Sequence, residues 1–189
     1  SASFTRGQMM SQPLIISDLL EYAAQHHNHA SIISQRLEGD IHQYHYSDAL
    51  KRSKQLANAL IQLGAKKGDR IATLAWNGYR HFECYYGISG MGAICHTVNP
   101  RLFSEQIEYI IQHAQDNILL VDACFLELIE PIIENLTSVK AVVVMIDEAN
   151  MPKSSIKNIY NYEALISQQP DEYTWPRLDP NSAACLCYT

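Results

Sequence analysis

The sequence has few charged residues, no concentrated positive charge and no long apolar run. Charged residues make up 18% of the chain, and its 14 basic residues, against 20 acidic ones, are scattered singly or in short clusters such as Lys66-Lys67. A nucleic-acid backbone requires a concentrated basic surface, so nucleic acid is a poor candidate partner. Apolar stretches such as residues 141–146 are far shorter than the ~20 residues that cross a bilayer. We therefore expect no transmembrane helix.

Cysteine is sparse and does not suggest a disulfide framework. The five cysteines are an odd, widely spaced set in apolar surroundings: Cys84, Cys95, Cys124, Cys185 and Cys187. Such a set is typical of buried thiols in a reducing compartment. The sequence therefore predicts a cytoplasmic location.

Several catalytic signatures are also missing. The sequence has no Gly-x-Ser-x-Gly elbow, no Walker loop and no His-Glu-x-x-His, which removes the usual hydrolase, P-loop and zincin patterns. The first residues lack both an initiator Met and the apolar core of a secretory signal. We expect residues 1–12 to be an added or disordered end, and residues 13–189 to form the folded part.

A hydrophobic content of 47% is enough for one sizeable core. A first helix is expected from Ser17 to near His26, followed by an antiparallel hairpin of residues 31–37 and 42–46 around a glycine turn. Apolar residues at three- and four-residue spacing then predict a helix that Ser47 caps and Gly64 ends.

From residue 70 the pattern alternates between strands and helices. Helices are expected at 79–91, 104–113 and 125–136, between strands at 70–75, 93–98, 118–121 and 141–146. Strands without a polar face indicate cover on both sides. The predicted fold is therefore α/β: a β-hairpin and helix segment followed by a mostly parallel sheet with helices on both faces.

The last part of the chain is less regular. Residues 147–161 read as an exposed loop and 162–167 as a short helix. Residues 183–189 read as a buried strand that stops abruptly, which predicts that the chain is part of something longer.

Histidines and cysteines do not form a convincing metal site. His26, His27 and His29 would point in different directions, and no acidic residue or cysteine completes a set. His42 and His45 would face opposite sides of a strand, as a surface pair. Cys185 and Cys187 would share one face of the last strand, where packing explains them better than zinc.

Two other patterns could concern ligands. Gly87-x-x-Gly90-x-Gly92 closes a helix instead of opening one, so close helix-to-strand packing explains it better than dinucleotide binding. Asp122 and Asp147 each follow a predicted strand, where open α/β sheets bind ligands, although either could be a helix cap or loop residue.

An ordered series of motifs resembles the amino-terminal region of ATP-dependent acyl-CoA synthetases, which are adenylate-forming enzymes. The motifs are LGAKKGDRIA at 63–72, WN-x-x-RH-x-E at 76–83, GA at 92–93 and VNPRL at 98–102. Arg80-His81, GMGA at 90–93 and NPRL at 99–102 look most like bacterial medium- and long-chain fatty acid ligases. The resemblance runs from about Pro13 to Thr189, where the family's phosphate loop begins.

This resemblance implies a fatty-acid–CoA ligase (AMP-forming) that uses ATP, Mg²⁺ and CoA. It also implies homodimerisation through the amino-terminal region. Peripheral contact with a membrane is left open. Thr189 matches the first position of the phosphate loop and is the one cofactor-binding residue that the resemblance assigns. The resemblance assigns no catalytic or metal-binding residue to this sequence. Arg80, His81 and Arg101 match family positions, where ion pairing, packing beneath the sheet or a subunit contact is the simpler explanation.

Without the phosphate loop, residues 1–189 alone are expected to be inactive and to hold no bound cofactor. Two alternatives stay open. One is a stand-alone binding or assembly module of the same ancestry. The other is a different adenylating enzyme, such as an aryl-CoA ligase or a peptide-synthetase adenylation domain.

Overall fold

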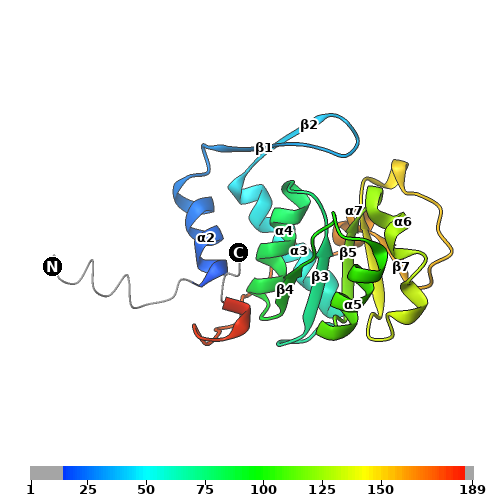
Figure 1. Ribbon diagram of the computed structural model, residues 1–189. Helices are drawn as coiled ribbons and strands as arrows, with labels where there is room; N and C mark the ends of the chain where they lie inside the picture. The colour runs from blue at the N-terminus through cyan, green and yellow to red at the C-terminus, as the bar shows by residue number, and fades with distance from the viewer. Residues whose placement is uncertain (1–14, 186–189) are drawn as a thin grey trace.

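A five-stranded parallel sheet forms the centre of the computed structural model, which describes residues 15–185 (Figure 1). Its spatial order is β4-β3-β5-β6-β7, and each neighbouring pair is parallel. The strands are β3 (Arg70–Leu74), β4 (Ile94–Thr97), β5 (Ile118–Asp122), β6 (Ala141–Met145) and β7 (Ile159–Asn161). The predicted α/β fold is confirmed.

Helices cover both faces of this sheet. On one face Ile71 and Leu120 pack in a core with α3 (Tyr46–Gln62), α4 (Tyr79–Gly90) and α7 (Tyr162–Ser167). On the other face Ala72 and Leu119 pack with α5 (Ser104–Ala114) and α6 (Leu126–Ile129). Because neighbouring residues of a strand point to opposite faces, apolar side chains at every position require this double cover.

The amino-terminal segment packs on α3 and α4, and the turn of its hairpin reaches the carboxyl ends of the strands (Figure 1). It consists of α2 (Ile16–His26) and an antiparallel hairpin of β1 (Ser31–Gln35) and β2 (Ile41–His45). Leu20 and Tyr44 bury their side chains against Ala49 and Tyr79. The predicted hairpin is confirmed, with Gly39 in the turn at a φ of 101°.

The predicted role of Ser47 is wrong. Helix α3 begins at Tyr46, and the backbone N–H of Ser47 donates to Asn28 Oδ1 at 2.8 Å. Asp48 takes the capping role instead, because its Oδ2 accepts the N–H of His45 at 3.0 Å.

The helix predicted over 125–136 is broken into pieces. Helix α6 covers only Leu126–Ile129, with 3-10 turns at Ala123–Phe125 and Ile133–Asn135. Pro131 explains the break, because proline lacks a backbone donor and its ring clashes with the preceding helical turn.

The carboxyl-terminal third departs from the prediction in two places. Residues 159–161, expected to be loop, form β7, which is too short to show a sequence period. Ala183–Cys185 is a 3-10 helix and does not begin a strand. The rest of that predicted strand lies outside the described residues, as does the end predicted at 1–12. No helix among residues 15–185 is long and apolar enough to cross a membrane.

Candidate functional site

The order of the strands selects one place at the carboxyl edge of the sheet. Strand β3 has β4 on one side and β5 on the other. The order in which strands are added to the sheet therefore reverses between β3 and β5. Open α/β sheets bind ligands in the crevice outside such a switch point. Here the crevice is bordered by Trp76, Asn77 and Gly78 after β3, by Arg80 and His81 in the first turn of α4, and by Asp122 at the end of β5.

Asp122 closes this crevice from the β5 side. Its Oδ2 accepts the backbone N–H of Trp76 at 2.8 Å, and the residue is only 7% exposed. Burial raises the pKa of the Asp122 carboxyl to about 6, although the Trp76 hydrogen bond and Arg80 favour the ionised form. The sequence pattern therefore located Asp122 correctly, and the structure makes it a link between two strands.

Asp147, the other carboxylate predicted at a strand end, has a different role. Its Oδ1 accepts the N–H of Asn150 at 3.0 Å, which caps the 3-10 turn Glu148–Asn150. Of the interpretations left open for Asp147, the cap is the one that the structure supports.

His81 is held in place by two hydrogen-bond partners, Thr73 and Trp76. Its Nε2 lies 3.1 Å from Oγ1 of Thr73 on β3, and the ring also bonds to the backbone of Trp76. Burial lowers the pKa of the imidazole, with the Trp76 hydrogen bond acting in the opposite direction. His81 therefore ties α4 to β3.

Arg80 connects the crevice to the hairpin. Its Nη2 lies 3.0 Å from Glu38 Oε2, and its Nε lies 3.2 Å from Glu163 Oε2. The same Glu38 oxygen accepts the N–H of Asp147 at 3.0 Å. Although burial opposes ionisation, the hydrogen bond from Arg80 keeps the pKa of Glu38 below its usual value. Ion pairing, the simpler explanation for Arg80, is confirmed.

A second buried carboxylate lies one turn further along α4. Glu83 is fully buried and accepts hydrogen bonds from Tyr44 at 2.8 Å, Arg52 at 2.7 Å and Tyr162 at 2.8 Å. Burial raises its pKa, while Arg52 acts in the opposite direction. Arg52 also binds Glu163 through both terminal nitrogens, at 2.9 and 2.8 Å. These charges join the hairpin, α3, α4 and α7 into one network.

The hairpin fills most of the switch-point crevice. Residues 35–37 line it together with Trp76 and Asp122, and the remaining cavity is about 40 Å³. A larger open pocket of about 620 Å³ lies beside it, between Ile32 of the hairpin, Phe82 of α4 and Thr97 at the end of β4. Space for a ligand is therefore found next to the crevice, on the β4 side.

Arg101 lies at the same edge of the sheet. Its guanidinium lies 5.7 Å from the ring centre of Trp76, a cation–π distance, and Phe125 contacts the ring from another direction. Trp76 remains 43% exposed. Arg101 thus packs on an aromatic ring, whereas Arg80 is enclosed by carboxylates.

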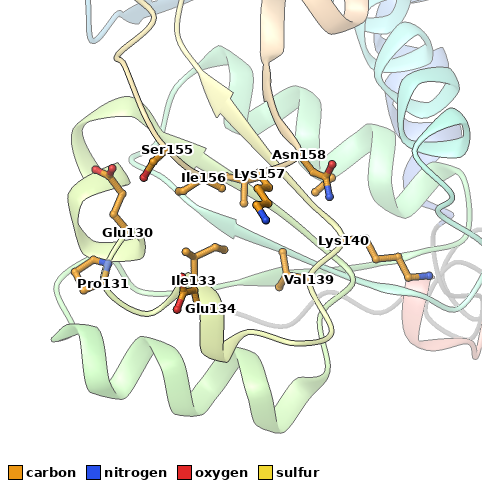
Figure 2. A pocket seen from close by; sticks show the side chains of 12 residues that line it. Glu130, Pro131, Ile133, Glu134, Val139, Lys140, Ser155, Ile156, Lys157 and Asn158 are labelled. Atoms are coloured by element: carbon orange, nitrogen blue, oxygen red, sulfur yellow. The ribbon is translucent and has the colours of Figure 1, made fainter.

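A further pocket of about 520 Å³ lies at the amino end of β6 (Figure 2). Glu130 and Glu134 border one side, and the side chain of Lys157 lies among Ile133, Ile156 and Val139 (Figure 2). Because ligands of parallel sheets bind at the carboxyl ends, this pocket is at the less favourable edge.

Within residues 15–185 no three His, Cys, Asp or Glu side chains are grouped to hold a metal. The expected surface pair of histidines is wrong for His42, whose ring stacks on Tyr79 with centroids 3.7 Å apart, whereas His45 is exposed. Strand alternation places these two histidines on opposite faces, as predicted. Cys187 lies outside the described residues.

The glycines of 87–92 serve close packing, but not mainly with a strand. A Cβ at Gly87 would lie 2.9 Å from Ser53 O on α3, and one at Gly90 would lie 2.5 Å from Trp175. Gly92 has a φ of +94° and lies against Lys67 and Leu178. The packing partners are therefore α3 and the carboxyl-terminal segment, which corrects the expected helix-to-strand contact.

Thr189, the predicted cofactor-binding residue, lies outside the described residues. Sequence reasoning missed Glu38, Arg52 and Glu163, and no local motif marks them, because the partners that link them to other elements lie 31 to 111 residues away. The ionisable groups bordering the crevice are engaged in holding strands, helices and hairpin together. The carboxyl edge of the sheet is therefore suited to positioning the chain segments that lie next to it.

Three comparisons relate the chain to known proteins. It is 43% identical over 183 residues to 3-methylmercaptopropionyl-CoA ligase from Ruegeria lacuscaerulensis, and 43% identical over 183 residues to medium-chain-fatty-acid–CoA ligase from Ectopseudomonas oleovorans. Each alignment covers 97% of this chain and 34% of the relative, so the chain spans about a third of their length. Coronafacic acid ligase from Pectobacterium brasiliense has the same fold, with a TM-score of 0.75 at 20% identity over 89% of this chain and 32% of that one.

The AMP-binding enzyme family matches residues 19–189, which include every strand and nearly every helix of the fold. This match extends over the motifs at 63–102 that first suggested adenylate-forming enzymes. The chain belongs to the AMP-binding enzyme family.

Proposed function

We propose that the chain is the amino-terminal part of an AMP-forming CoA ligase that activates a medium- or long-chain fatty acid. The observation that carries this proposal is 43% identity, over 183 residues, with a relative named as a medium-chain-fatty-acid–CoA ligase. In the first half-reaction the acid's carboxylate attacks the α-phosphate of ATP, giving acyl-AMP and pyrophosphate. In the second, the thiol of CoA displaces AMP and forms the thioester.

Within such an enzyme, the described residues would have a structural role, and phosphate binding would lie elsewhere in the chain. Asp122, His81 and Arg80 hold the carboxyl edge of the sheet in a defined shape. The phosphate-binding groups would begin at Thr189 and continue into sequence beyond it. Magnesium would accompany the ATP phosphates. Residues 1–189 alone should therefore be inactive.

The first test is to read the coding frame past Thr189 for about 10 residues, the reach of a phosphate-binding loop. A run rich in Ser, Thr and Gly that ends in Lys is the expected result. A stop codon at that position would exclude the enzyme and leave a binding module, for which partner capture is the next experiment.

The second test is ATP–pyrophosphate exchange by the full reading frame, with octanoate, palmitate and 3-methylmercaptopropionate as separate substrates. Exchange that depends on octanoate or palmitate supports the proposal. Exchange only with 3-methylmercaptopropionate would replace the fatty acid by that substrate class. Chain 1–189 serves as the matched control and should give no exchange.

We also propose a cytoplasmic homodimer. The thiols of Cys84, Cys95 and Cys124 are free, as suits a reducing compartment. Ile33 and Ile41, on the outer face of the hairpin, are 64% and 72% exposed, which suits a subunit contact. Sedimentation of the full-length protein tests the dimer, and Ile33→Lys together with Ile41→Lys should shift it toward the monomer.

A further inference from the structure

The β-hairpin has only one packed face. Its strands β1 and β2 pair with each other, and among residues 15–185 neither pairs with a strand of the five-stranded sheet. Ile32 and Tyr44 on the inner face pack against α4. Ile33 and Ile41 on the outer face are 64% and 72% exposed. Because a two-stranded hairpin is at best marginally stable in water by itself, its contacts with the helices keep it in place.

His42 lies on the inner face, between the hairpin and α4. Its ring stacks on Tyr79 of α4, with the ring centroids 3.7 Å apart and the planes 10° from parallel, and it meets the ring of Tyr44 edge-on at 4.6 Å. The Nδ1 atom of His42 is buried and has no hydrogen-bond partner among the residues that the structure describes. A protonated imidazole carries an N–H on both ring nitrogens, so protonation would leave a buried donor unsatisfied. The docked hairpin therefore favours the neutral ring.

Positive charge surrounds this ring. Arg52 of α3 and Arg80 of α4 lie 5.5 and 4.9 Å from the centre of the Tyr79 ring, on which His42 stacks. Burial lowers the pKa of His42 most, and these two arginines and Arg36 lower it further. A protonated His42 would therefore be a fourth cation among three guanidinium groups.

The opposing negative charge comes from Glu163 of α7, which favours the protonated ring. Its carboxylate is already bound by Arg52 Nη2 at 2.8 Å and by Arg80 Nε at 3.2 Å. Glu163 therefore offsets the arginines before it can offset a charge on His42. The charged and titratable groups that face His42 from the elements packed against it are Arg36, Tyr44, Arg52, Tyr79, Arg80 and Glu163.

The hairpin also fills the crevice at the switch point, through residues 35–37. We propose that the hairpin is a strap over this crevice, which docks while His42 is neutral and loosens when His42 takes up a proton. The crevice and the open pocket of about 620 Å³ share lining residues in the loop after β3 and in the first turn of α4, namely Asn77, Gly78, Tyr79 and His81. A lifted strap would join the two into one larger space.

The direction of the pH effect follows from the state that holds the proton less tightly. Because the pKa of His42 is lowered from 6.5 in the docked state, docking has its full strength above pH 6.5 and weakens as the pH falls below that value. Glu38 anchors the hairpin turn by binding Arg80 and the N–H of Asp147. The pKa of Glu38 is lowered, so this anchor stays ionised above about pH 5. It therefore does not titrate over the range in which the strap loosens.

Amide hydrogen exchange of the chain 1–189, followed by NMR between about pH 7.5 and about pH 5, tests the strap. The reporter is the N–H of Asp147, which donates to Glu38 in the hairpin turn at 3.0 Å. Its protection, taken relative to an unstructured peptide at the same pH, should fall roughly threefold or more in acid. The amides of Leu119 and Leu120 in β5 should keep their protection.

His42→Phe is the decisive variant. Phenylalanine keeps the stack on Tyr79 and takes up no proton, so protection at Asp147 should be the same at both pH values. His113→Gln, at an exposed position on α5, should keep the response of the unaltered chain. Asp122→Asn should keep it as well, which separates His42 from the crevice carboxyl whose pKa is about 6.

The ring of His42 supplies a second measurement that needs no variant. Nitrogen NMR of the imidazole follows its protonation directly in the unaltered chain. The midpoint of this titration should coincide with the midpoint of the loss of protection at Asp147. Midpoints that differ would exclude His42 as the trigger.

Three results of the exchange experiment would also overturn the strap. Protection at Asp147 that does not change with pH would leave the hairpin fixed, and a loss that persists in His42→Phe would assign the response to another group. A loss that β5 shares would indicate global unfolding instead of a local opening. None of these measurements uses ATP or acyl substrates, so failure of the proposed function would be seen separately, in the exchange assay with pyrophosphate.

Discussion

The backbone N–H of Trp76 donates to Oδ2 of Asp122 at 2.8 Å, and this bond joins the carboxyl ends of β3 and β5. This hydrogen bond spans the switch point between β3 and β5. A ligand entering there would have to displace Trp76 or the hairpin. Asp122 therefore stabilises a closed crevice, and its ionisation should be visible in the stability of the fold.

Replacement of Asp122 by Asn should change how stability depends on pH. Burial raises the pKa of Asp122 from 3.8 to about 6, so the folded state holds the proton more tightly than the unfolded state does. The stabilisation by this proton is complete below pH 4 and is lost as the pH rises through 6. Relative to the unaltered chain, Asp122→Asn should gain about 3 kcal/mol in unfolding free energy between pH 4 and pH 7.

Urea unfolding of both chains across this range measures the difference. Asp171→Asn, at an exposed position, should follow the unaltered chain. If the unfolding free energies of Asp122→Asn and the unaltered chain change with pH in the same way, the raised pKa of Asp122 is contradicted.

Glu83→Gln should destabilise the fold strongly. The substitution removes the buried charge that faces Arg52 and weakens the acceptor for Tyr44 and Tyr162. Loss of one partner of a buried ion pair costs roughly 3 kcal/mol. Denaturant unfolding measures this loss, and Glu127→Gln at an exposed position should stay within about 0.5 kcal/mol. Equal stability of the two variants would mean that the pair contributes little.

Gly87→Ala should lower stability although alanine favours helices. The added Cβ would lie 2.9 Å from Ser53 O and 3.2 Å from Leu56 Cδ2, so α3 and α4 must move apart. Overpacking outweighs the gain in helix propensity, for a net loss of about 1 kcal/mol. Gly78→Ala is the matched control, because a Cβ there has nothing within 4 Å. A more stable Gly87→Ala variant would show that the helix contact is looser.

Glu38→Gln should release the hairpin turn without unfolding the sheet. Arg80 keeps Glu163 as a partner, but the N–H of Asp147 loses its charged acceptor. Amide exchange at Asp147 should become roughly tenfold faster, while exchange within β5 stays unchanged. Glu148→Gln, at an exposed position in the 3-10 turn that follows Asp147, should leave exchange at Asp147 unchanged. A uniform rise across the sheet would instead indicate global destabilisation.

The elements that could be predicted are those with a local cause. The alternation of buried strands with helices, the turn at Gly39 and the end of α3 before Gly64 are all visible in short stretches of sequence. Pro131 breaks the helix predicted over 125–136, and the three residues of β7 show no period. The predicted cap of α3 is misplaced because the helix begins before Ser47, at Tyr46, with Asp48 accepting the N–H of His45.

The candidate site was predictable only in part. Asp122 follows an apolar strand, so its place at the sheet edge could be inferred from local pattern. Glu38 and Arg80 are 42 residues apart, and Arg52 and Glu163 are 111 apart. No local rule pairs such residues, so neither the network nor the filling of the crevice by the hairpin could be derived from spacing.

The long reach of this charge network has a consequence for synthesis of the protein. Arg52 is made 111 residues before Glu163, the carboxylate that binds two of its nitrogens. At translation rates of about 5–20 residues per second, α3 and the hairpin wait on the order of 10 s for α7 to leave the ribosome. During that interval Arg52 can pair only with Glu83, and the apolar face of α3 lacks the cover of Tyr162 and Ile166. The apolar face of α3 in the nascent amino-terminal third thus gains its full cover only after α7 is translated.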